Sequence, residues 1–135
     1  MTKLVWLSDL HFSASERPFG IDTKASLLSA FAQVEQNAPD AEGCVISGDL
    51  VNRATDENYA ALAELLCAFD HPVFPMVGNH DVRRNVRNHF SLPASTMDDF
   101  IQYSVEFDDC TILCLDTQDQ GADHGAFCSR RADWL

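Results

Sequence analysis

The chain has 135 residues, of which 46% are hydrophobic, and this suits a globular unit with a core of its own. Its net charge of −12 argues against a general nucleic-acid-binding or membrane-surface role, because phosphate backbones and anionic lipids repel an acidic surface. The five cysteines include no C-x-x-C pair, which predicts free thiols, and no signal peptide or membrane span is recognisable. We therefore expect a cytoplasmic protein.

Strands and helices are predicted to alternate along the first half of the chain. The apolar run 4–7 is expected to be a strand buried on both faces. A helix capped by Asp22 is expected to continue to about Val34, with Leu28 and Phe31 on its apolar side. Residues 44–47 repeat the strand pattern.

The rest of the chain is predicted to add a long helix, an apolar strand, a looser helical stretch that leads to Leu92-Pro93, and a hairpin. Thr55 or Asp56 is expected to cap a helix that extends to Phe69, and an apolar strand follows at 73–77. Residues 103–107 alternate as a half-buried strand, and a turn then leads into a second strand at 111–115. Both long helices would cover one face of a single sheet.

Metal-seeking side chains follow three of the predicted strands directly. Carboxyl ends of parallel strands meet at one edge of an open α/β sheet, so these side chains are expected to converge there. Extended backbone would place the first and third residues of the first motif on the same side of the chain. The three motifs are Asp9-Leu10-His11, Gly48-Asp49 and Gly78-Asn79-His80-Asp81.

Each motif alone also has an ordinary interpretation. Asp-x-His and Gly-Asp are common loop sequences, since these residues favour turns. Gly-Asn-His-Asp is compatible with a simple turn, because Asn tolerates left-handed backbone. The occurrence of all three, in this order and each after an apolar strand, favours a metal site.

Together the three motifs resemble the first three motifs of the calcineurin-like metallophosphoesterases. The sequences around the second and third motifs, with Leu115-Asp116-Thr117 and the stretch 125–135, are similar to the branch of class III cyclic-nucleotide phosphodiesterases and glycerophosphodiesterases. The resemblance implies an α/β fold, as part of a four-layer αββα sandwich. We expect mainly its amino-terminal sheet, with flanking helices and a β-hairpin.

The resemblance also implies a binuclear metallophosphoesterase, a hydrolase of phosphoric esters and in particular a phosphodiesterase. Asp9, His11 and Asp49 would hold one ion, and Asp49 and Asn79 the second. These would be divalent or trivalent transition metal ions, because mixed oxygen and nitrogen ligands suit Mn, Fe or Zn. A metal-bound hydroxide would attack a phosphodiester or phosphomonoester, and His80 would be catalytic, contacting the phosphoryl or leaving oxygen.

The expected substrate is a small phosphoester, such as a cyclic nucleotide or a glycerophosphodiester. Arg53 follows shortly after the second motif in the sequence, so among the arginines it is the better candidate for contact with the substrate phosphate. Arg83 and Arg87 lie four residues apart and fit either a solvated helix face or a phosphate contact.

Some expected features of the family are missing from this chain. A further ligand histidine and a Gly-His-x-His motif complete the metal sites of the superfamily, and neither is present. His71, His89 and His124 are expected to be surface or loop histidines. Residues 1–135 are therefore expected to form a single calcineurin-like phosphoesterase domain, incomplete at its carboxy-terminal end.

Two functional interpretations stay open. One is the metal-dependent phosphoesterase, and the other is a catalytically incomplete fragment or scaffold subunit that keeps the fold. An uncovered sheet face or edge would also favour self-association.

Overall fold

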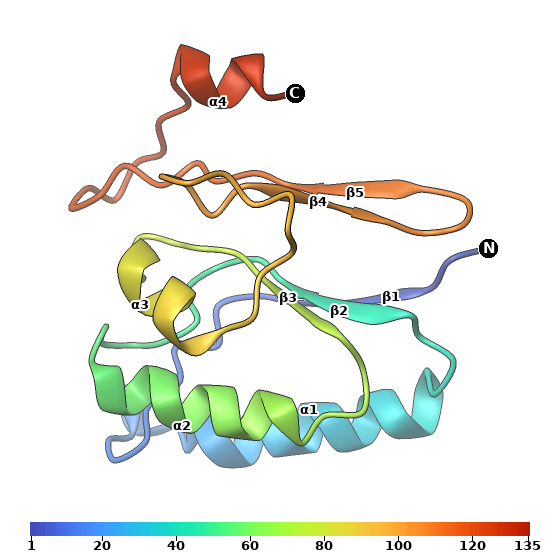
Figure 1. The fold of residues 1–135 in the computed structure, drawn as a ribbon. Coiled ribbons are helices and arrows are strands. Elements are labelled where there is room, and N and C mark those ends of the chain that lie inside the picture. Colours follow the sequence, from blue (N-terminus) through green and yellow to red (C-terminus); the bar gives the residue numbers. More distant parts are fainter.

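Three parallel strands form the central sheet of the computed structural model, which describes residues 1–135 (Figure 1). They are β1 (Leu4–Leu7), β2 (Gly43–Ile46) and β3 (Val73–Pro75), in the order β1-β2-β3. All four residues of the middle strand are buried. Because the strands are parallel, the loops after them leave at the same edge of the sheet.

Two helices cover one face of this sheet, as predicted (Figure 1). They are α1 (Thr23–Asn37) and α2 (Asp56–Cys67). Asp22 caps α1 by accepting a hydrogen bond from the Ala25 N–H, and Thr55 caps α2 by accepting one from Asn58. The two predicted caps are therefore confirmed.

An antiparallel hairpin covers the other face, and a short helix lies beyond it (Figure 1). The hairpin consists of β4 (Tyr103–Glu106) and β5 (Thr111–Cys114), and the outer helix is α4 (Ser129–Asp133). The Tyr103 hydroxyl donates to the Pro75 carbonyl at 2.9 Å and so ties the hairpin to the central sheet. The resulting order of helix, sheet, sheet and helix confirms the predicted fold class.

The remaining elements are short. A 3-10 helix, η1 (Pro18–Gly20), lies between β1 and α1, and α3 (Arg83–His89) follows the third motif. None of the helices combines the length and the apolar character that crossing a membrane requires. All five cysteines are free thiols, as predicted.

Two predictions about burial are wrong. β1 is not buried on both faces, because it forms an edge of the sheet and its Trp6 is 75% exposed. On α1, Leu28 is exposed, while Leu27 and Phe31 are buried, so the buried face follows their i, i+4 spacing.

Candidate metal centre

The loops after β1 and β2 stay hydrogen-bonded to each other beyond the ends of the strands. The Asp9 N–H donates to the Gly48 carbonyl at 3.2 Å, and the His11 N–H donates to the Asp49 carbonyl at 2.9 Å. Phe12 and Val51 then form an isolated parallel bridge. The first and second motifs are therefore fixed side by side by their main chains.

The backbone of these motifs is left-handed and not extended. The φ angles are 54° at Asp9, 41° at His11 and 49° at Asp49, values that residues other than glycine seldom adopt. The expectation that extended backbone aligns Asp9 with His11 is therefore wrong. The two side chains nevertheless approach each other, with His11 Nε2 3.9 Å from Asp9 Oδ1.

Two glycines bring the third motif against the second. Gly48 has a φ of 101°, and a Cβ there would lie 2.8 Å from the Gly78 nitrogen. A Cβ on Gly78 would lie 2.5 Å from the Asp49 nitrogen and 2.2 Å from Asp49 Oδ1. Only residues without side chains allow this approach of the two loops.

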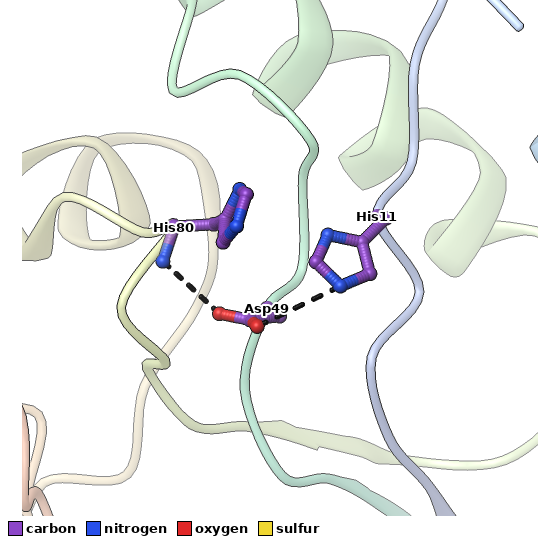
Figure 2. Close-up of side chains that lie close together, drawn as sticks. All are labelled: His11, Asp49 and His80. Atoms are coloured by element: carbon purple, nitrogen blue, oxygen red, sulfur yellow. Dashed lines mark hydrogen bonds and ion pairs between the residues drawn. The ribbon is translucent and has the colours of Figure 1, made fainter. Parts of the chain in front are cut away.

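Figure 2 shows the result, a cluster of His11, Asp49 and His80, one residue from each motif. Asp49 Oδ2 lies 3.7 Å from His11 Nε2, while Asp49 Oδ1 accepts the His80 N–H at 3.0 Å. One possible ligand atom from each residue lies within 4.8 Å of the other two. The expected convergence of the three motifs is therefore present.

The imidazole of His11 lacks partners in a way that fits a bound metal. Its Nδ1 is buried without a hydrogen bond, and its Nε2 is too far from Asp49 Oδ2 for one. Buried polar atoms of this kind call for a missing partner. His80 Nδ1 lies 2.9 Å from the Asn52 carbonyl, which only accepts, so neutral His80 offers a lone pair at Nε2. Imidazole nitrogens beside a carboxylate suit a transition metal ion.

Asp9, Asn79 and Arg53 lie outside this cluster of three. Asn79 is exposed, its Nδ2 lies 3.4 Å from Asp123 Oδ1, and it lines a cavity of about 170 Å³ with the segment 117–125. Arg53 is exposed, and its Nε pairs with Glu16 Oε2 at 3.3 Å. Their proposed contacts with a metal and with substrate stay predictions.

The other basic candidates have structural partners. Arg83 forms two hydrogen bonds to the buried Asp116 carboxylate, at 2.7 and 2.8 Å. Arg87 donates to two backbone carbonyls, of Met97 and Phe100. Neither arginine therefore belongs to a solvated helix face or is free for a phosphate.

The three remaining histidines differ from one another. His71 lies in the loop before β3, as one of the two predicted alternatives had it, but it is not at the surface, since it is only 9% exposed and bonds through Nδ1 to the Ala41 carbonyl at 2.9 Å. His89 is partly buried and pairs with Asp56. His124 is exposed in a loop, as expected.

The sequence interpretation missed the residues that hold the third motif in place. Asp81 is buried and accepts hydrogen bonds from Leu50 N, Gly78 N and the Tyr59 hydroxyl, at 3.1, 2.9 and 3.0 Å. Burial raises the pKa of the Asp81 carboxyl, and the two N–H donors oppose that rise. Gln118 bonds to the same turn. In the sequence, only the position of Asp81 within the third motif indicated a role for it, and nothing indicated a role for Gln118.

The calcineurin-like phosphoesterase family model matches residues 2–134. The chain belongs to this family. The resemblance inferred from the motifs is therefore confirmed.

Curated relatives are named as phosphodiesterases. A probable cyclic nucleotide phosphodiesterase of Rhodopseudomonas palustris is 32% identical over 136 residues, which cover 98% of this chain and 50% of that protein. A 3′,5′-cyclic adenosine monophosphate phosphodiesterase of Haemophilus influenzae is 27% identical, covering 98% and 48%. A probable glycerophosphodiester phosphodiesterase of Arcobacter nitrofigilis is 22% identical, covering 98% and 50%. The chain thus spans about half the length of these relatives.

Proposed function

We propose that this calcineurin-like phosphoesterase is a metal-dependent hydrolase of phosphodiesters. The observation that carries the proposal is the His11 imidazole, which lacks hydrogen-bond partners beside Asp49 and His80. Relatives named for cyclic nucleotides and for glycerophosphodiesters support these two compound classes as substrates. We also propose that residues 1–135 act as one domain, because one core cluster joins both helices, the central sheet and the hairpin.

Asp9, His11 and Asp49 are the proposed ligands of one metal ion, and Asp49 and Asn79 those of a second. A carboxylate has two oxygens and can contact both ions. Transition metal ions, when bound, lower the pKa of water and offset negative charge on phosphoryl oxygens. The donor set of carboxylates, imidazole and amide favours Mn, Fe or Zn.

His80 is the proposed proton donor to the phosphoryl or leaving oxygen. Its Nδ1–H donates to the Asn52 carbonyl, which orients the ring, so Nε2 would donate the proton from the protonated form of the ring and be left with a lone pair. The backbone N–H of His80 also orients the Asp49 side chain, because it donates a hydrogen bond to Asp49 Oδ1. Arg53 is the candidate for binding a substrate phosphate, an interaction for which it would leave Glu16.

Hydrolysis of bis(p-nitrophenyl) phosphate, 3′,5′-cyclic AMP and a glycerophosphodiester by the purified protein, with and without Mn²⁺, tests the proposal. We expect Mn²⁺-dependent hydrolysis of at least one substrate, lost on chelation and in Asp49→Asn. Metal binding without hydrolysis would support the scaffold interpretation. A protein that neither binds Mn²⁺ nor hydrolyses any of the three would refute the proposal.

A further inference from the structure

The Gln118 side chain extends from the segment after β5 to the turn that carries Asn79 and His80. Its Nε2 donates to the Gly78 carbonyl and to the Asp81 carbonyl, each at 2.6 Å. These two carbonyls belong to the residues on either side of Asn79 and His80. One side chain thus holds both ends of the turn.

The orientation of the Gln118 amide follows from its partners. The amide nitrogen carries two hydrogens, one for each carbonyl, whereas a flipped amide would set an oxygen against two other oxygens. In the observed orientation Oε1 is buried without a partner, and the residue is only 7% exposed. Burying an acceptor without a partner is unfavourable, so the favourable contribution of this amide comes from its two donated bonds.

The main chain of Gln118 is itself hydrogen-bonded to three charged side chains, of which Asp116 and Arg131 are buried. Its carbonyl accepts from Arg83 Nη2 at 2.7 Å and from Arg131 Nη1 at 3.2 Å. Its N–H donates to Asp116 Oδ1 at 3.0 Å, and Arg83 binds the same carboxylate. Arg83 begins α3, directly after the turn. Arg83 therefore links the segment after the turn to the main chain of Gln118.

We propose that Gln118 is a positioning residue that sets the placement of Asn79 and His80, an inference that rests on the proposed function for the roles of those two residues. Outer contacts of this kind orient the groups that bind a metal. Their loss typically lowers metal affinity by about 10- to 100-fold. A purely structural glutamine would change the stability of the fold without changing the turn in particular.

The test compares Gln118→Met with Gln102→Met. Gln102 is a matched control, because it is fully buried, donates through Nε2 to the Arg131 carbonyl at 2.9 Å and also has an unpartnered Oε1. Hydrogen exchange of the metal-free protein reports on the turn through two amides, Asp81 N–H on the Gly78 carbonyl and His80 N–H on Asp49. We expect exchange at both to be faster in Gln118→Met than in wild type and unchanged in Gln102→Met. Equal exchange in the two variants would overturn the proposal.

Titration with Mn²⁺ alone, followed by electron paramagnetic resonance, gives a second measurement. We expect Gln118→Met to bind Mn²⁺ about 10-fold more weakly and Gln102→Met to match wild type. If wild type binds no Mn²⁺, the proposed function fails, and the exchange data still decide the role of Gln118.

A measurement on wild type covers the case in which Gln118→Met does not fold. The side-chain amide protons of Gln118 should exchange slowly in ¹H–¹⁵N spectra, because both are hydrogen-bonded. Exchange at the rate of a free glutamine would overturn the proposal.

Discussion

At the scale of single residues, Asp49 contacts both neighbouring motifs. Its Oδ2 faces the His11 ring and its Oδ1 accepts the His80 N–H. Asn79 lies at the surface, beside Asp123. The two proposed ligands of the second ion therefore differ in how firmly they are held.

Asp49→Asn is expected to reduce bound metal more than Asn79→Ala, because only Asp49 is proposed to touch both ions. The asparagine keeps the size of the side chain and tolerates the positive φ of 49° at this position. Metal content per chain, measured by plasma mass spectrometry after gel filtration, gives the answer. Equal metal content in wild type and Asp49→Asn would remove the binuclear model.

His80→Ala is expected to keep its metal and to slow turnover by roughly 10²- to 10⁴-fold, the range usual for a positioned acid or base. A ring nitrogen of His80 also lies within 4.8 Å of the possible ligand atoms of His11 and Asp49, so metal content has to be measured beside kcat. A loss of metal in this variant would make His80 a ligand, and unchanged turnover would make it structural.

The convergence of His11, Asp49 and His80 could be predicted, because motifs after successive parallel strands meet at one edge of a sheet. The left-handed backbone at Asp9 and His11 could not, since it depends on hydrogen bonds to a loop about 40 residues away. Gln118 was missed for the same reason. Its partners Gly78 and Asp81 are identified only once the chain is folded.

At the scale of elements, the site depends on how closely the loop after β3 packs on the loop after β2. Gly48 and Gly78 are in contact where the two loops meet. The strands themselves are only three or four residues long, so these loop contacts help to fix how the strands are aligned with one another.

Gly78→Ala is expected to destabilise the fold by about 3 kcal/mol, the upper range for overpacking, because the new methyl group would meet the Asp49 backbone. Urea denaturation measures the loss. Gly121→Ala is the control, since a Cβ there has open space around it and meets only the strain of its φ of 87°. That strain costs roughly 1–2 kcal/mol. A smaller loss at Gly78 than at Gly121 would contradict this account.

The helix caps at Asp22 and Thr55 were predictable, because capping depends on residues close in the sequence. The exposure of Trp6 was not, because an apolar run does not reveal whether its strand is central or at an edge.

At the scale of the whole molecule, the outer edges of the two sheets lie next to each other. A cavity of about 230 Å³ between β1 and β5 is lined mainly by apolar side chains, among them Val5, Trp6 and Ile112. Trp6 and Leu113 are also exposed beside it. Edge strands with exposed apolar residues favour pairing with another chain.

We expect the protein to self-associate, and more strongly as salt is added, because salt screens the repulsion between copies of net charge −12. Trp6→Lys should reduce this association, since lysine on an edge strand opposes pairing. Phe19→Lys makes the same change in charge at another exposed aromatic residue and should have less effect. Sedimentation velocity at two salt concentrations tests both variants. A wild type that is monomeric in both would contradict the expectation.

The residues of the site with left-handed backbone lower the stability of the fold but supply the proposed chemistry. Asp9, His11 and Asp49 each hold a conformation that glycine would adopt without strain, so a glycine at any of them would relax the backbone. The same change would delete a proposed ligand. Directed evolution of this chain for heat resistance alone would therefore be expected to enrich glycine at these positions. The resulting proteins would be more thermostable but inactive.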